Sequence, residues 1–302
     1  MQTLKGIFPV IPSLFKEDNS LDIDAQRKVT RWALESGAHG VVFPGVASEY
    51  NYLSLEERAE LLGVVCGEVG DAVPVVGGAS APGADEAVKA GKQAMEYGIR
   101  HLMVMAPAGL GQDLASQKGF FGEVAGGLSG ATLILQNAPA PVGAGLDAAM
   151  MAEIVRGIPS IRYIKEETLP SGPVISALLD SGIPHLDGVL GGGGARYIID
   201  EFERGACAAL PAVELTDLHC ALYNAFIGGD NARARDLYRW SLPLLVSQAI
   251  YRMRLTKYVL GKRGVADNPY IRAPLPELDT QAKLDIDQMA NDLEGMLDCP
   301  TS

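Results

Sequence analysis

The chain has 302 residues, of which 48% are hydrophobic and 21% are charged, which is typical of a globular protein with a sizeable core. Its formal net charge of −12 argues against a nucleic-acid or an anionic-membrane partner. The four cysteines and four histidines are scattered without a metal-binding spacing, so we expect neither a metal nor another cofactor. We find neither a membrane-length apolar run nor a signal-peptide pattern, and we therefore expect a cytoplasmic protein.

Short apolar segments bounded by Gly, Pro and small residues recur along the first two thirds of the chain. They predict strands at 6–15, 40–48, 73–80, 101–109, 131–139, 161–168, 185–192 and 207–213. Helical patterns between them lie at 21–37, 53–70, 84–98, 147–158, 173–182 and 195–206. One of these helices opens with Ser54-x-x-Glu57, which is a capping-box pattern.

This alternation predicts an α/β protein whose parallel sheet is covered by helices. Eight strand–helix units predict a (β/α)8 TIM barrel, and an open doubly wound sheet is disfavoured because no G-x-G-x-x-G follows the first strand. Further helical patterns at 215–229, 231–264 and 279–297 predict a C-terminal helical extension, with Pro243 near an early bend or a new helix start. We therefore predict a barrel over residues 1–225 and a helical domain over residues 226–302.

The stretch Ile161–Pro170 places charged residues at the end of an apolar strand pattern. Because alternate side chains of a strand share a face, Lys165 and Glu167 point the same way and Glu166 points the other way. Chemistry in such a barrel sits at the C-terminal ends of the strands, where a desolvated, neutral lysine attacks a ketone to form a Schiff base. The alternative is a lysine that reaches solvent and pairs with Glu166.

The other strand ends supply Ser13, Ser48, Glu49 and Gln136, together with Gly191–Gly194. The glycine run matches no phosphate-binding spacing, and we interpret it as a loop of small residues beside the site. We expect Glu49 to be a structural carboxylate.

Several motifs in chain order resemble the dihydrodipicolinate synthase / N-acetylneuraminate lyase family. They are GIFPVIPSLF, GVASE, NAPAPVG, YIKE and YIRAPLPEL. The resemblance covers nearly the whole chain and implies a (β/α)8 barrel with a C-terminal helical domain, a homotetramer, and Lys165 as the Schiff-base residue.

The chain departs from this family at the proton relay. Gln136 stands where the family has a tyrosine, and Val46 and Ala47 stand where it has hydroxyl residues. The combination of Gln136 with Lys165 and Glu167 is similar to a subgroup that includes L-2-keto-3-deoxyarabonate dehydratase, in which the glutamate takes over acid–base work. This departure argues against dihydrodipicolinate synthase and sialic-acid lyase activity.

The resulting hypothesis is a lyase that acts on a small-molecule 2-keto-3-deoxy acid, with Lys165, Glu167 and Gln136 as catalytic residues. Substrate binding is assigned to residues from other strand ends, namely Ser13, Ala47, Ser48 and Gly191. Dehydration is favoured, and a pyruvate-releasing class I aldolase remains the alternative. A non-catalytic barrel that binds a keto acid is the alternative from another class.

Overall fold

The computed structural model describes residues 3–297 and divides the chain into two compact units. Unit 1 consists of Met1–Lys5 and Val75–Leu210, and unit 2 consists of Gly6–Pro74 and Pro211–Ser302. The predicted division of the chain at residue 225 stays a prediction.

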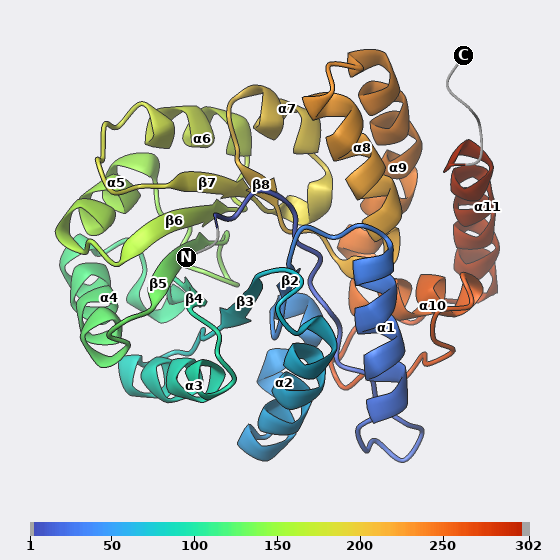
Figure 1. Ribbon diagram of the computed structural model, residues 1–302, viewed down its shortest axis with the longest axis horizontal. Coiled ribbons are helices and arrows are strands. Elements are labelled where there is room, and N and C mark those ends of the chain that lie inside the picture. The colour runs from blue at the N-terminus through green and yellow to red at the C-terminus, as the bar shows by residue number, and fades with distance from the viewer. Residues whose placement is uncertain (1–2, 298–302) are drawn as a thin grey trace. The chain divides into compact units, whose positions relative to one another are not determined.

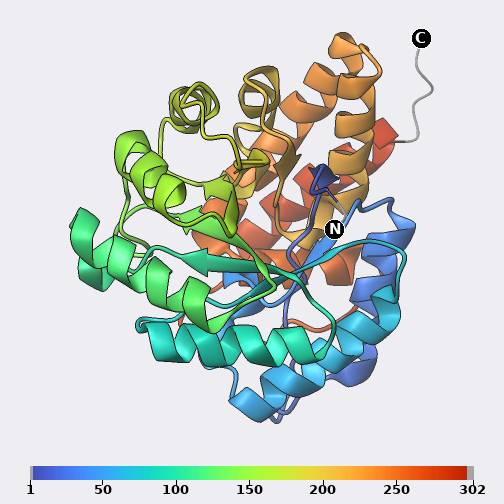
Figure 2. The same cartoon turned by 60° about the vertical axis from the view of Figure 1, so that its left-hand side comes forward.

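Unit 1 is built on a parallel sheet whose strands pair in chain order, from β3 to β8. The strands are β3 (Val75–Gly78), β4 (His101–Met105), β5 (Thr132–Asn137), β6 (Ile161–Glu166), β7 (Gly188–Gly191) and β8 (Ala208–Ala209). The connecting helices are α3 (Ala84–Glu96), α4 (Leu114–Gly127), α5 (Ala148–Gly157), α6 (Ser171–Leu179) and α7 (Ile198–Glu203). Figure 1 shows these helices along the outer side of the curved sheet, and the turned view in Figure 2 agrees.

The sequence of these strands explains why they lie inside unit 1. Every residue of β4 and β5 is buried, which is the pattern of parallel strands covered on both faces. Two of the helices begin at an aspartate that caps the first turn: Asp113 accepts a hydrogen bond from Ser116 N–H, and Asp147 accepts one from Met150 N–H.

Helix α4 was not among the predicted helices. Its sequence, LASQKGFFGEVAGG, contains several glycines, which weaken a helical pattern because glycine has a low helix propensity. The helix forms because its apolar residues Phe120, Phe121 and Val124 are buried. Tertiary packing thus outweighs local propensity in this segment.

Unit 2 contains two short strands and six helices among its described residues. They are β1 (Gly6–Ile7), β2 (Val41–Val42), α1 (Ile23–Glu35), α2 (Leu55–Val69), α8 (Thr216–Ile227), α9 (Asn231–Tyr251), α10 (Met253–Lys262) and α11 (Thr280–Leu297). Val10 extends the strand pairing through parallel bridges to Val42 and Ala212. The predicted capping box is confirmed, since Ser54 and Glu57 each accept a hydrogen bond from the other's backbone N–H.

The predicted new helix start near Pro243 was wrong, and the alternative of an early bend there stays a prediction. Helix α9 runs through Pro243 without interruption, and the chain breaks instead at Arg252, whose φ of 48° is left-handed. An arginine at this φ cannot continue a right-handed helix, so α10 starts as a separate element.

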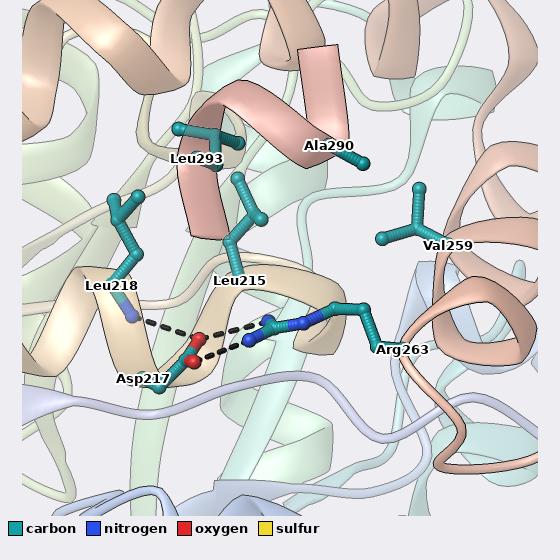
Figure 3. Close-up of a pocket in the computed structure, with 7 residues that line it drawn as sticks. All are labelled: Leu215, Asp217, Leu218, Val259, Arg263, Ala290 and Leu293. Carbon is teal, nitrogen blue, oxygen red and sulfur yellow. Dashed lines mark hydrogen bonds and ion pairs between the residues drawn. The ribbon is translucent and has the colours of Figure 1, made fainter. Parts of the chain in front are cut away.

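Figure 3 shows how α8 and α10 are joined in unit 2. The Asp217 carboxylate accepts hydrogen bonds from the Arg263 guanidinium and from Leu218 N–H. Apolar residues surround this pair, namely Leu215, Val259, Ala290 and Leu293. The cavity that remains is about 10 Å³, which holds about one water molecule and no larger ligand.

In the part of the chain that the structure describes, every helix is too short or too polar to span a lipid bilayer.

Candidate active site

Strand β6 carries the two central residues of the candidate site. Lys165 is the fifth residue of the strand and is only 6% exposed, while Glu167 directly follows the strand end. The Lys165 Nζ lies 2.7 Å from the Glu167 Oε1. The two side chains therefore meet on one side of the strand, as their alternate positions require.

Gln136 reaches the same carboxylate from the neighbouring strand. Its Cα pairs with that of Lys165 in the β5–β6 register, so the two side chains leave the sheet on the same face. The Gln136 Nε2 donates a hydrogen bond of 2.6 Å to the Glu167 Oε1. A single carboxylate oxygen thus accepts from an amine and from an amide.

Glu166 makes contacts away from Lys165. Its Oε2 accepts a hydrogen bond of 2.9 Å from Asn137 Nδ2, and its Oε1 accepts from both the backbone N–H and the hydroxyl of Thr168. Burial raises the pKa of the Glu166 carboxyl, while the hydrogen bonds from Asn137 and Thr168 act in the opposite direction. The alternative in which Lys165 pairs with Glu166 is therefore replaced by the contact with Glu167.

Two glycines at the end of strand β7 allow side chains to approach the sheet closely. A Cβ on Gly191 would lie 2.1 Å from the Glu201 Oε2, and a Cβ on Gly192 would lie 2.1 Å from the Glu167 Cγ. Real Cβ atoms do not approach other atoms so closely, so a side chain at either position would displace a glutamate. The glycine run thus makes room for carboxyl groups, and the role of Gly191 in substrate binding stays a prediction.

Glu201 is a further buried carboxyl group that the sequence did not reveal. Its Oε1 accepts a hydrogen bond of 2.8 Å from the Ser171 hydroxyl. Burial, assisted by the nearby charges of Asp200, Glu166 and Glu167, raises the pKa of Glu201 to about 7 against the lowering effect of the hydrogen bond from Ser171. Nothing in the local sequence of helix α7 marked this residue, because its position depends on packing against strand β7.

The other predicted site residues belong to unit 2. The Ser13 hydroxyl donates a hydrogen bond of 2.6 Å to the Ser48 carbonyl oxygen. The Ser48 hydroxyl donates to the Ile11 carbonyl oxygen at 2.5 Å and accepts from Gly45 N–H at 2.9 Å. Both serines are fully buried, and their hydroxyls hold the loop after strand β2 in place.

Ala47 lies in the middle of the short helical turn Val46–Ser48 and is half-buried. The roles of Ser13, Ala47 and Ser48 in substrate binding stay predictions.

Glu49 is confirmed as a structural carboxylate. Its Oε1 lies 2.8 Å from the Lys257 Nζ, and both side chains are completely buried. Its Oε2 accepts hydrogen bonds from the backbone N–H groups of Arg272 and Ala273. All three contacts lie within unit 2, so Glu49 fastens the loop after β2 to α10 and to the segment that follows it.

Among residues 3–297, no group of three or more His, Cys, Asp and Glu side chains is arranged to hold a metal ion.

Comparisons with known proteins identify the family of this chain. Residues 3–178 match the Dihydrodipicolinate synthetase family. The chain belongs to this family. Its members are lyases that work through a Schiff base, and the chain is therefore supported as an enzyme.

Two relatives and one solved structure illustrate the range of the similarity. The chain is 26% identical over 286 residues to L-2-keto-3-deoxyarabonate dehydratase of Azospirillum brasilense, which covers 93% of this chain and 92% of the relative. It is 25% identical over 280 residues to 4-hydroxy-tetrahydrodipicolinate synthase of Methanosphaerula palustris, covering 92% and 95%. The crystal structure of dihydrodipicolinate synthase from Rhodopseudomonas palustris superposes with a TM-score of 0.89 at 23% identity, covering 97% and 99%.

The structural similarity confirms the predicted fold as a (β/α)8 TIM barrel with additional C-terminal helices. The two sequence relatives carry different activities at nearly equal identity, so sequence identity does not decide between their reactions.

Proposed function

We propose that this protein is a lyase that dehydrates a 2-keto-3-deoxy sugar acid through a Schiff base on Lys165. The observation that carries this proposal is the position of the Glu167 Oε1, which lies within hydrogen-bond distance of both the Lys165 Nζ and the Gln136 Nε2. An amine, a carboxylate and an amide that converge at the C-terminal ends of parallel strands match the requirements of carbonyl chemistry with proton transfer.

The first step needs an uncharged amine, because only the free electron pair of nitrogen attacks a ketone. Glu167 is within reach to accept the proton from the Lys165 ammonium group, since the two groups are 2.7 Å apart. The amine then attacks C2 of the substrate, and the protonated Glu167 returns its proton to the resulting C2 hydroxyl, which leaves as water to give an iminium and the Glu167 carboxylate. The positive iminium nitrogen makes the C3 protons acidic.

The second step removes water from the substrate carbon chain. Glu167 takes one C3 proton to give an enamine, whose electron pair then expels the C4 hydroxyl as the protonated Glu167, or a water held by Gln136, returns a proton. Hydrolysis of the iminium consumes one water, equal to the one released on its formation, and frees Lys165. For a pentonate, the released 5-hydroxy-2-oxopent-3-enoate isomerises through its C4–C5 enol to 2-oxoglutarate semialdehyde, with the net loss of one water.

The absence of a titratable group at position 136 supports dehydration over other family reactions. An amide only donates and accepts hydrogen bonds, so Gln136 orients Glu167, a substrate hydroxyl or a water but does not carry a proton. Acid–base work then rests on Glu167. The similarity to L-2-keto-3-deoxyarabonate dehydratase points in the same direction.

A substrate panel tests this proposal. The purified protein is incubated with five-carbon 2-keto-3-deoxy acids of different stereochemistry, and the products are assayed separately for pyruvate and for a semialdehyde. We expect semialdehyde without pyruvate. Pyruvate as the main product would replace the dehydratase with a class I aldolase.

Borohydride trapping tests the Schiff base itself. With pyruvate or a 2-keto-3-deoxy acid, we expect a reduced adduct on the peptide that contains Lys165, and no adduct in Lys165→Arg. A matched control is Lys118→Arg, since Lys118 is an exposed lysine of the same unit that pairs with Glu153. Folded protein that binds the keto acid but forms no adduct would identify a non-catalytic binding protein.

We also propose a homotetramer in the cytoplasm, as the family resemblance implies. Sedimentation velocity over a range of concentrations tests the assembly, and a species with the mass of one chain at all concentrations would contradict it.

A further inference from the structure

We propose that Glu166, which faces away from Lys165, is the positioning residue that holds Glu167 over the amine. This inference rests on the proposed function, since that function gives Glu167 its acid–base role. Glu166 acts through the backbone of the segment that follows strand β6 and touches no reacting atom.

The first part of the argument is the set of donors around Glu166. Its two carboxylate oxygens accept hydrogen bonds from three groups: Asn137 Nδ2 at 2.9 Å, Thr168 N–H at 2.5 Å, and the Thr168 hydroxyl. All three groups donate, so they stabilise the ionised form of the carboxyl, which only accepts. Because Glu166 is fully buried, no water replaces a lost partner at low cost.

The second part is the rigidity of the partner on strand β5. The Asn137 Nδ2 also donates to the Leu146 carbonyl oxygen at 2.9 Å, and the Asn137 Oδ1 accepts from Leu146 N–H at 2.8 Å. Three hydrogen bonds therefore fix the Asn137 side chain. The Glu166 carboxylate is therefore hydrogen-bonded to a side chain that is itself held in place by two hydrogen bonds to the Leu146 backbone.

The third part is the backbone on either side of Glu167. Glu167 N–H donates to the Asn137 carbonyl oxygen at 2.9 Å, and the Glu166 carbonyl oxygen accepts from Gly192 N–H at 2.9 Å. The Glu166 carboxylate then holds Thr168 on the far side. The backbone is thus fixed before and after Glu167, and only its side-chain torsions remain adjustable.

These constraints direct the Glu167 carboxyl to one place. Gly192 leaves the space that the Glu167 Cγ occupies, because a Cβ there would lie 2.1 Å from it. The Glu167 Oε1 then reaches the Lys165 Nζ and the Gln136 Nε2 at 2.7 and 2.6 Å. If the bonds from Glu166 to Thr168 are lost, the backbone after the strand relaxes and the Glu167 Oε1 leaves this position.

Three substitutions test this inference. Glu166→Gln replaces one acceptor oxygen by an amide nitrogen, which donates hydrogen bonds and cannot accept them. Thr168→Val removes only the hydroxyl donor, and Thr168→Ser retains it. Glu214→Gln serves as a matched control, since it alters a buried carboxyl group of unit 2. For each variant, kcat, KM and the rate of borohydride trapping with pyruvate are measured, together with the thermal unfolding temperature.

We expect kcat to fall by about 10²-fold in Glu166→Gln, because a displacement of about 1 Å in a reacting group costs that much. The kcat of Thr168→Val falls about tenfold through the loss of one charge-assisted hydrogen bond, and Thr168→Ser restores it. KM stays within about twofold of the wild type because uniform binding is preserved. Borohydride still labels Lys165 to the same final extent, but at a lower rate, because the displaced Glu167 no longer accepts the Lys165 proton. Glu214→Gln leaves kcat unchanged.

Unchanged kcat in Glu166→Gln, or an equal loss of kcat in Thr168→Ser and Thr168→Val, overturns the inference. If Glu166→Gln does not fold, the two Thr168 variants decide the question. A crystal structure of Glu166→Gln gives a readout without activity: we expect the distance from the Lys165 Nζ to the Glu167 Oε1 to exceed 4 Å. An unchanged distance overturns the inference, whereas a wild type without adduct or turnover overturns only the proposed function.

Discussion

The Lys165 amine and the Glu167 carboxylate lie 2.7 Å apart although their strand positions differ by only two residues. Same-face neighbours on a strand are about 7 Å apart at their Cα atoms, a gap that two long side chains close when both lean toward each other. The contact is therefore local. It depends on the strand geometry of β6 and on the interactions that hold Glu167 directly after the end of the strand.

Replacement of Glu167 by glutamine separates Schiff-base formation from turnover. Glu167→Gln keeps the size of the side chain and its ability to accept a hydrogen bond, but it cannot take up a proton at neutral pH. We expect kcat to fall by about 10²–10⁴-fold, the usual contribution of general acid–base catalysis. Borohydride trapping with pyruvate should still label Lys165. Full turnover by this variant would remove Glu167 from the mechanism.

Gly192→Ala is expected to displace the same carboxyl group by steric conflict. The new methyl group would lie 2.1 Å from the Glu167 Cγ, so the glutamate side chain must rotate away from Lys165. We expect a loss of kcat of about 10²-fold with Schiff-base trapping retained. Gly122→Ala is the matched control, since no atom lies within 4 Å of its Cβ position in helix α4. The kcat of the control should equal that of the wild type, and equal activity of both variants would refute the steric argument.

The buried pair of Glu49 and Lys257 predicts a stability effect in unit 2. Lys257→Met leaves the Glu49 carboxylate buried without its counter-ion, which typically costs 3–5 kcal/mol, here taken as about 4 kcal/mol in the free energy of unfolding. Adding Glu49→Gln removes the uncompensated charge, and the double variant should be more stable than Lys257→Met alone. Urea unfolding measures the wild type, the two single variants Lys257→Met and Glu49→Gln, and the double variant. Additive losses in the double variant would show that the two residues do not interact.

His219 predicts a loss of stability at acidic pH. Within the described chain neither of its ring nitrogens has a hydrogen-bond partner, and burial lowers its pKa to about 4 from 6.5. Between these two values the unfolded chain binds more protons than the folded chain, so the free energy of unfolding falls as the pH drops from about 6.5 to about 4. The full contribution is roughly 3 kcal/mol.

His219→Leu should remove this part of the pH dependence while keeping the site apolar. Urea unfolding at pH 4.5 and pH 7 measures it, with the wild type as the reference. The difference in stability between the two pH values should be smaller in the variant. An unchanged difference would mean that His219 is not a source of acid sensitivity.

The central pair of the candidate site was predictable because it depends on a period of two along one strand. The period of two placed Lys165 and Glu167 on one face but left the pairing of Lys165 with Glu166 open. The family resemblance singled out Lys165 and Gln136, and in the structure Gln136 joins the pair through the β5–β6 register. The role of Glu166 was not predictable, because its side chain was expected to face away from the Lys165 amine and nothing else in the sequence singled it out. Its importance depends on Asn137 and Thr168, whose contacts appear only in three dimensions.

The fold was predictable for a similar reason. Strand patterns at regular intervals predicted the barrel, whereas helix α4 was missed because its glycines hide the helical pattern. The alternative of a new helix start near Pro243 was wrong, since α9 continues through the proline and its neighbours Leu244 and Leu245 are buried. In both segments packing between distant residues decides the outcome.

Gly191 and Gly192 have no side chains, so two glutamates approach the backbone at the end of strand β7. Glu201 lies close to Gly191, and Glu167 lies close to Gly192. Substitutions at these two positions are therefore not neutral, since any larger residue displaces a glutamate side chain from its position. Relatives in which either glycine is replaced should therefore carry a shorter acid, aspartate, at the position of Glu201 or Glu167. Such paired substitutions would make this spatial constraint visible in sequence comparisons alone.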